Sequence, residues 1–580
     1  METMKMIYKI RIYCLIALSG LSAAVAAQEE QGVNRELTLE REYDPSVQDA
    51  NKVNTLPAVK EPAVNKRPID YSAFTVPAEP KRELGILPPG NIMTTIQYNK
   101  RRGYLNAGAG MYFNVNADAG YHILNTDQNQ LNIFLSHRST KGNLKYLQQE
   151  WDRKVKAKLN DHLGGIKFLH QFEQAALKLS AQYGYSSFNY YGLSPSNELR
   201  PIDFETNQVN RLLHVNGGVE SIEDSSVGYL LDLNYTNFSY KYGLDKETKG
   251  ITEQAFGGKL GLSGTFGGNQ EIAIRGLFNY FNYSMPPENS TAAFSFENYF
   301  EGTLNPYYKV EGENWNLKLG AKVMFITGDS STLFVSPDMA ADITVGNRTV
   351  LYLVAGGDIQ SNSAYMLSRE NRYINPEQGV TPSRTWLDAT VGLKSGVAPG
   401  FWFNLFGGYK ITDKDYFFVP YQSNRMFGNV SHVLPLNSKR LQAGLEMKYA
   451  YQKVFEVALK GVYTNWNVDK KASASPASPE NKAYGRPKME FTAGFTVCPI
   501  DNLTLGLDYY LATGRETFLP LYGNEKMKNI NELNVAGSYN FNDTFGAYVK
   551  LNNLLFQKYE MLYGYPLQGF NVMGGININF

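Results

Sequence analysis

The last eleven residues, 570–580, constrain the fold more than any other stretch of the sequence. Phe570, Val572, Gly574, Ile576, Ile578 and Phe580 share one parity, and Asn571, Asn577 and Asn579 share the other. Because successive side chains of an extended strand point to opposite faces, one face would be apolar and the other would carry amides. Such a strand at the end of a chain suits a closed membrane barrel, whose last strand pairs with its first so that no edge faces lipid.

The same alternation recurs from residue 103 onward. In 315–325, the apolar residues Leu317, Leu319 and Val323 alternate with the polar residues Asn316, Lys318 and Lys322. Similar runs occupy 113–123, 441–449, 503–511 and 533–541, and each is long enough to cross a bilayer when tilted. After the first 27 residues no apolar run of about 18 residues remains, which excludes helical membrane spans.

The connections between these runs alternate in length. Short turns are predicted at 125–130, 172–174, 223–226, 267–270, 311–314, 346–348, 398–400, 451–453, 499–502 and 542–544. Longer polar or aromatic stretches separate them, among them 190–207, 360–384, 412–439, 467–485 and 513–529. The pattern predicts a transmembrane antiparallel β-barrel of about 22 strands over 103–580, with both ends on the short-turn, periplasmic side. A soluble sandwich or propeller, the alternative, would not sort loops by length in this way.

The amino-terminal part divides into two segments. Residues 1–27 combine a basic start, an apolar run and a small-residue stretch, which predicts a cleaved secretory signal peptide. Residues 28–102 hold one short strand candidate and seven prolines between Pro57 and Pro89, and they predict an extended periplasmic leader. A plug domain needs a folded core, which this leader does not supply.

Composition and motifs argue against several function classes. The net charge of +1 offers no basic field for nucleic acid, and forty Tyr with thirty-two Phe suit aromatic girdles and loops. The six His have no Ser or Asp partner at motif spacing, and paired-Cys metal signatures are lacking. We therefore expect neither an enzyme nor a bound cofactor or metal.

The final residues from Gly574 to Phe580 resemble the terminal signal of bacterial outer-membrane barrels, which the barrel assembly machinery reads. The strand count is similar to that of TonB-dependent receptors, and the leader phrase at 42–52 resembles a receptor-like barrel family of Bacteroidota. The missing plug, with no convincing TonB box, departs from that pattern and puts energised uptake in doubt. The resemblance implies an outer-membrane module for solute passage or reception, surrounded by lipid and lipopolysaccharide; a structural subunit of an assembly or secretion complex is the alternative.

Two sets of side chains are candidate sites. Polar parity assigns Lys154, Lys156 and Lys158 to the lumen as a basic patch beside a wall of mutually neutralising charges. The long connections carry Tyr190, Tyr191, Tyr416, Phe417, Phe418, Tyr421 and Tyr522. These aromatics would either close the mouth or bind a sugar, a peptide or a partner protein. A periplasmic or surface protein is a candidate partner of the chain, and the leader would lie at the periplasmic mouth or reach a partner there. Because a barrel of this size is too wide for wall side chains to fill, we expect loops 190–207, 360–384 and 412–439 to fold inward.

Overall fold

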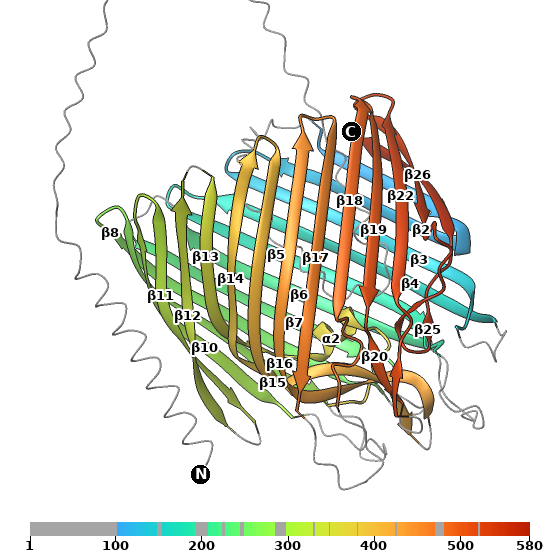
Figure 1. Cartoon of the computed structure of the whole chain (residues 1–580), viewed down its shortest axis with the longest axis horizontal. Coiled ribbons are helices and arrows are strands. Elements are labelled where there is room, and N and C mark those ends of the chain that lie inside the picture. Colours follow the sequence, from blue (N-terminus) through green and yellow to red (C-terminus); the bar gives the residue numbers. More distant parts are fainter. Residues whose placement is uncertain are drawn as a thin grey trace, which may run out of the picture. The chain divides into compact units, whose positions relative to one another are not determined.

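The structure, a computed structural model, is built almost entirely of strands (Figure 1). It describes residues 101–147, 154–192, 207–222, 227–243, 249–284, 297–328, 331–346, 348–379, 381–423, 426–469, 481–519 and 523–580. The predicted signal peptide lies outside these residues, as does the proline-rich leader except for Arg101 and Arg102. Among the residues described, no helix has the length and apolar character needed to span a membrane.

Twenty-two antiparallel strands form one closed sheet. The first eleven are β1 (Gly103–Gly110), β2 (Asn114–Asn125), β3 (Asn129–Lys145), β4 (Lys154–Gln171), β5 (Ala175–Asn189), β6 (Asn207–Ser221), β7 (Val227–Tyr240), β8 (Thr252–Phe266), β9 (Gln270–Ser284), β10 (Tyr299–Glu311) and β11 (Trp315–Thr327). The others are β12 (Thr332–Val345), β13 (Thr349–Gln360), β14 (Ser383–Ala398), β15 (Phe401–Ser423), β16 (Met426–Tyr451), β17 (Phe455–Val468), β18 (Met489–Ile500), β19 (Leu503–Thr513), β22 (Ile530–Asn540), β23 (Phe545–Asn552) and β26 (Asn571–Asn579). The predicted barrel of about 22 strands is confirmed.

Four smaller elements lie in the connections. A single-turn 3-10 helix, η2 (Met111–Phe113), joins β1 to β2, and α2 (Ala364–Glu370) follows β13. Two short hairpins, β20 (Glu516–Leu519) with β21 (Gly523–Lys526) and β24 (Glu560–Leu562) with β25 (Tyr565–Pro566), lie in the connections before β22 and β26. All four elements lie at the same end of the barrel, which we call the long-loop end.

The short connections fall at the opposite, short-turn end, where the sequence predicts them. Barrel strands meet there at tight turns such as 172–174 and 267–269, and β1 begins there beside the end of β26. One predicted long loop is wrong, because 412–439 is mostly strand: β15 and β16 continue as a paired hairpin well past their neighbours. Bulges between Thr412 and Asp415 and between Pro420 and Gln422 interrupt this hairpin.

Side chains along each strand alternate between the two faces of the barrel. On β7, Leu231 and Leu233 are exposed on the outer face, while the Asp232 carboxylate between them accepts hydrogen bonds from Asn216 of β6 on the inner face. The outer face is therefore an apolar belt and the inner face is polar over most of the wall. This is the distribution required of a barrel that stands in lipid.

The seam between β1 and β26 closes the barrel. Leu105 pairs with Ile578, and the backbone amides of Gly103 and Phe580 each donate to the other's carbonyl at 2.7 and 2.9 Å. The Phe580 ring stacks on Tyr121 and covers Gly103 so closely that a Cβ there would lie 2.5 Å from the ring. Glycine at 103 thus makes room for the terminal aromatic ring. The pairing of the last strand with the first is confirmed, and the role of this strand in membrane insertion stays a prediction.

Candidate functional site in the barrel lumen

The inner wall carries charged side chains in cross-strand pairs, most of them toward the short-turn end. Five pairs share this arrangement: Lys178 with Glu220, Lys318 with Asp338, Lys410 with Asp388, Lys448 with Glu456 and Lys460 with Glu446. Their side chains keep between 16% and 52% of their surface exposed, so they line a solvated space. Pairs in that setting neutralise the wall and add little stability, about 0–1 kcal/mol each.

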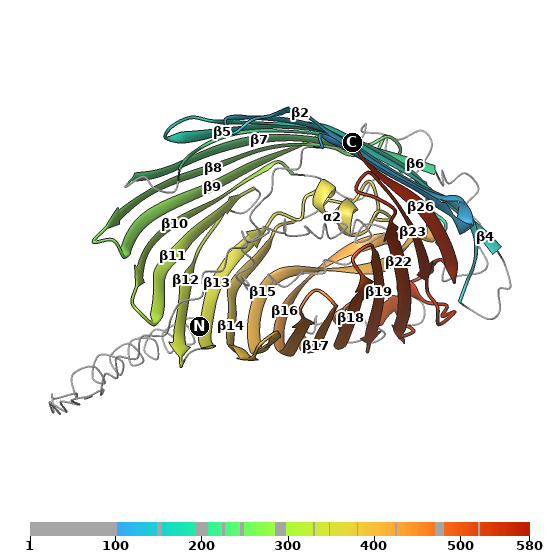
Figure 2. The same ribbon diagram turned by 90° about the horizontal axis from the view of Figure 1, so that it is seen from above.

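The long-loop half of the lumen is filled by the connection from β13 to β14. We call residues 361–382 the inner loop; Figure 2 shows its helix α2 inside the ring of strands. Asn362 enters it with φ of 50°, a left-handed conformation that Asn tolerates, and the Ser363 side chain then caps α2. Leu367 of α2 is fully buried against Phe238 and Ile251. The predicted inward folding of this loop is confirmed.

Two carboxylates of the wall hold the start of the inner loop. Glu253 of β8 accepts hydrogen bonds from the backbone amides of Ala364 and Tyr365, at 2.5 and 3.4 Å. Glu301 of β10 accepts one from the Ser361 hydroxyl at 2.5 Å. Both carboxylates are almost completely buried, at 1% and 3% exposure, and Glu301 also accepts a hydrogen bond from Asn279 of β9 at 2.9 Å. The start of the inner loop is therefore held by acceptors that lie out of contact with solvent.

The second half of the inner loop bonds to two other parts of the wall. Arg372 donates to both carboxylate oxygens of Asp161 on β4, at 3.2 and 3.1 Å. Burial by itself would lower the pKa of the Arg372 guanidinium, but Asp161 raises it above its ordinary value, so the pair stays charged. Gln378 exchanges two hydrogen bonds with the backbone of Val433 on β16, at 2.6 and 2.7 Å. The loop is therefore fixed to β4, β8, β10 and β16, which lie on different sides of the lumen.

An aromatic cluster packs between the inner loop and two other connections. Tyr373 stacks on Tyr565 with ring centroids 4.0 Å apart, and it meets Phe188, Tyr190 and Tyr191 edge to face. The predicted loop aromatics Tyr190 and Tyr191 are 2% and 6% exposed, so they belong to this core and not to an open binding surface.

The extension of the β15–β16 hairpin carries the next group of predicted aromatics. Tyr416 packs in the cluster of α2 and donates a hydrogen bond to Glu370, which also pairs with Arg486. Phe417 points the other way and is fully buried beside Tyr484, whereas Phe418 contacts Tyr416 edge to face and packs against the cluster of α2. The extension thus lies between the inner loop and the connection that follows β17. The Tyr421 side chain and Tyr522 lie outside the described residues.

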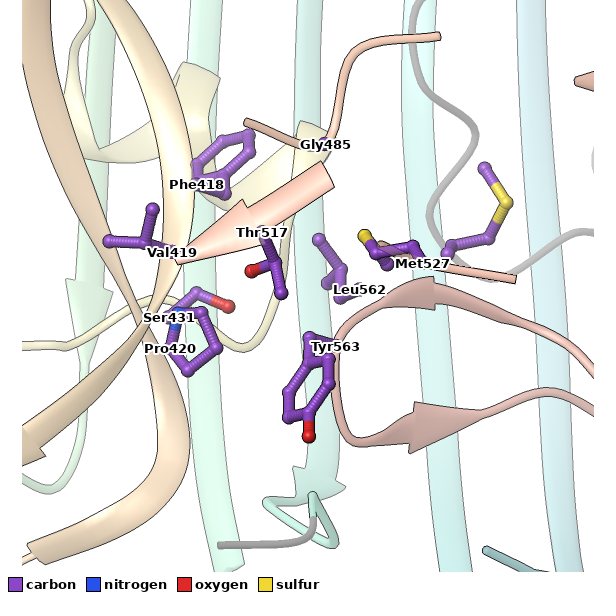
Figure 3. A pocket seen from close by; sticks show the side chains of 10 residues that line it. Phe418, Val419, Pro420, Ser431, Gly485, Thr517, Met527, Leu562 and Tyr563 are labelled. Carbon is purple, nitrogen blue, oxygen red and sulfur yellow. The ribbon is translucent and has the colours of Figure 1, made fainter. Parts of the chain in front are cut away.

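Where this extension meets β20 and the β24–β25 hairpin, the structure holds a small pocket (Figure 3). Its lining is mainly apolar: Phe418, Val419, Pro420, Ser431, Gly485, Thr517, Met527, Met561, Leu562 and Tyr563. Its enclosed volume is about 10 Å³, which is far below the range of about 300–1,000 Å³ typical of small-molecule sites. We assign no substrate site to it.

The interpretation of Lys154, Lys156 and Lys158 as a lumen patch is wrong. On β4 the intervening residues Val155 and Ala157 pack inward, against the aromatic cluster around Tyr373. Alternation therefore turns the three lysines to the outer face, where all are exposed. Along the belt the inner face is polar, but at this height the inner face of β4 is apolar, because it packs against the aromatic cluster around Tyr373.

Comparisons with known proteins identify solved structures of similar fold. No protein-family model matches the sequence, and no relative is found among curated proteins. Among solved structures, the FrpB iron transporter from Neisseria meningitidis is similar with a TM-score of 0.63 at 11% identity, over 83% of each chain. The siderophore receptor PiuA from Acinetobacter baumannii gives 0.58 at 11% identity, over 83% of this chain and 82% of that one. The copper transporter OprC gives 0.59 at 12%, over 83% and 81%.

At these identities the similarity shows the fold alone. The barrel that the sequence resemblance implied is confirmed by the closed sheet of 22 strands. The structures of similar fold are those of receptors and transporters. Within the ranges that the structure describes, no group of three His, Cys, Asp or Glu side chains is placed to hold a metal ion.

Proposed function

We propose that this chain is an outer-membrane transport or receptor-like module, whose lumen is the route of a polar solute and whose inner loop closes that route. The solvated, ion-paired wall on the short-turn side of the inner loop carries the proposal. A lumen lined by neutralised charges suits polar solutes, and a barrel of 22 strands is wide enough to need a closure. A subunit that served only as scaffold would not require such a lining.

The orientation follows from the positions of the ends of the barrel. We place the short-turn end in the periplasm and the long-loop end outside, since bacterial barrels have short periplasmic turns and longer outer loops. In this orientation β1 begins on the periplasmic side and β26 ends there. The leader would emerge there, within reach of a periplasmic partner.

Closure by the inner loop makes the passage gated and not a permanent hole. The loop is held by polar contacts to four strands and by one aromatic cluster, and these contacts can break without unfolding the wall. Binding of a solute or a partner at the mouth would therefore shift the loop between closed and open states. We leave the substrate and the energy source unassigned.

Solute flux through liposomes tests this function. We would compare the full chain with a variant in which residues 364–379 are replaced by a short Gly-Ser linker, using neutral sugars and amino acids of increasing size. Faster swelling of the variant, with a cut-off in solute size, is expected. Heat-dependent migration on a gel would verify that the variant barrel is folded.

A folded variant that passes no solute would refute the transport proposal. In that case the alternative, a structural subunit of an outer-membrane assembly or secretion complex, would gain support. Stoichiometric copurification of a partner protein bound to the folded barrel would then be the decisive observation.

A further inference from the structure

Three cations gather on the inner face of β9 and β11, on the short-turn side of the inner loop. They are Arg275 of β9 and Lys318 and Lys322 of β11, and we call them the lumen cation cluster. Ile274 and Leu319 of the same strands are exposed on the outer face of the barrel. Because side chains alternate along a strand, the three cations are turned toward the lumen.

Tyr307 of β10, the strand between β9 and β11, forms the floor of the cluster. Its ring centroid lies 4.4 Å from the Lys318 ammonium nitrogen and 5.3 Å from the central carbon of the Arg275 guanidinium. Gly320 lies opposite Tyr307 in the register, and a Cβ there would stand only 2.7 Å from the Tyr307 Cβ. The Tyr307 hydroxyl donates to Glu271 at 2.9 Å, which fixes the ring. One buried ring therefore positions two cations that come from the strands on either side of it.

A single carboxylate pairs with the cluster. Asp338 of β12 pairs with Lys318 at 2.5 Å, while the Lys322 ammonium donates to the carbonyl oxygen of Gly357 at 2.9 Å. Among the residues that the structure describes, neither Arg275 nor Lys322 forms an ion pair with a carboxylate. Two of the three positive charges thus have only neutral partners.

The other charged groups on β9, β10 and β12 are already bonded to partners of their own. Glu271 accepts from Tyr307, Lys309 pairs with Glu311, Asp342 accepts from Asn316, and Glu301 accepts from Ser361. In the strand register Arg275 lies opposite Asn305, whereas Glu271 lies opposite Lys309, nearer the short-turn end. The inner wall therefore carries a local excess of positive charge at the height of Arg275.

The cluster lies close to the closure of the lumen. Along β10, Asn305 is four residues from Glu301, which bonds to the inner loop, and this spacing corresponds to about 13 Å in a strand. Arg275 is exposed, and Lys318 keeps 28% of its side-chain surface exposed, so both can be reached from the lumen. A solute that passed the inner loop on this side would meet these cations next.

We propose that the lumen cation cluster is a transit site for a small polar solute that carries an oxyanion group, either a phosphate or a carboxylate. The Arg275 guanidinium can donate two parallel hydrogen bonds to such a group, and the lysine ammonium groups can add charge-assisted ones. This inference rests on the proposed function, because it names the class of solute that the lumen would carry.

Equilibrium binding to the purified full chain in detergent tests the cluster. The probes are glucose 6-phosphate and glucuronate, with glucose as the uncharged reference. The variant Arg275→Gln/Lys322→Gln is compared with the natural chain and with a control, Lys167→Gln/Lys394→Gln. The control removes two inner lysines that each stand over a separate ring, away from the cluster, and it changes the net charge by the same amount.

The natural chain and the control should bind the anionic sugars in preference to glucose. The Arg275→Gln/Lys322→Gln variant should bind them at least about tenfold more weakly, because a hydrogen bond to a charged group contributes about that factor. Binding of only one of the two anionic sugars would support the proposal and identify the oxyanion group.

Equal affinity of the natural chain and the Arg275→Gln/Lys322→Gln variant for the anionic sugars would overturn the proposal, with heat-dependent migration showing that the variant is folded. An equal loss of affinity in the Lys167→Gln/Lys394→Gln control would also overturn it, because the effect would then come from the net charge of the lumen. If the barrel without its inner loop passed neutral sugars in liposomes but no anionic sugar bound, this site would be rejected while the proposed function stood.

Discussion

Strand β4 passes through two regions of opposite polarity. Near the short-turn end Ile166 faces outward and the inner side is polar, whereas near the long-loop end Lys156 faces outward and Ala157 faces inward. Alternation is the same in both regions, and only the surroundings of each face differ. In the belt lipid lies outside and water inside; at the long-loop end the solvated face is outside and the aromatic cluster lies inside. Alternation therefore shows that two faces exist, but what covers each face decides which one is apolar.

Exchanging side chains between the two regions should have the largest effect. Leu135→Lys places a charge on the lipid-facing belt, which costs about 2–4 kcal/mol near the bilayer centre, whereas Lys158→Leu removes a charge outside the hydrocarbon. We expect Leu135→Lys to reduce the heat-modifiable, folded band in outer membranes severely. Lys158→Leu should leave it near the natural level. Equal loss of the folded band in the two variants would mean that the boundary of the apolar belt does not lie between Leu135 and Lys158.

The second prediction concerns the inner side of the long-loop region. Tyr373→Ala removes the ring that stacks on Tyr565 and contacts Phe188, and large buried aromatic rings contribute about 3–5 kcal/mol. The barrel should still form, because no wall strand is altered, while the inner loop should become sensitive to protease added from outside. Tyr463→Ala, which removes a 57% exposed ring from the outer face of β17, is the control and should not change cleavage.

The sequence was sufficient to predict the wall and the inward folding of the connection 360–384, but not how the side chains inside the lumen pack. Belt strands such as 315–325 keep a strict period of two, because one face meets lipid and the other water. In the β15–β16 extension Tyr416 and Phe417 are buried on opposite sides, so the alternation disappears and the hairpin looks like an aromatic loop. Lys154, Lys156 and Lys158 alternate correctly, yet their direction depends on Tyr190 and Tyr373, which are distant in sequence.

A smaller effect is expected where the inner loop meets β8. Glu253→Gln keeps the shape of the side chain and one carbonyl acceptor but removes the charge that faces the first amides of α2. A carboxylate in that position contributes about 0.3–2 kcal/mol, so the loop should open more often without being released. The amides in 364–370 should exchange their hydrogens faster, by the factor that this loss of free energy corresponds to. The exchange rates of amides in β19, on a distant part of the wall, should not change. Unchanged exchange in α2 would show that Glu253 does not hold the helix.

Cysteine labelling of neighbouring positions tests the inverted polarity and the filled lumen together. In a Cys498→Ser background, Lys156→Cys, Ala157→Cys and Leu367→Cys would each be treated on intact cells with a membrane-impermeant maleimide. Lys156→Cys should label fast, and the other two should label at least about tenfold more slowly, because an opening free energy above about 1.4 kcal/mol protects them. If Ala157→Cys and Leu367→Cys labelled as fast as Lys156→Cys, the inner loop would not fill the lumen and the central claim would be wrong.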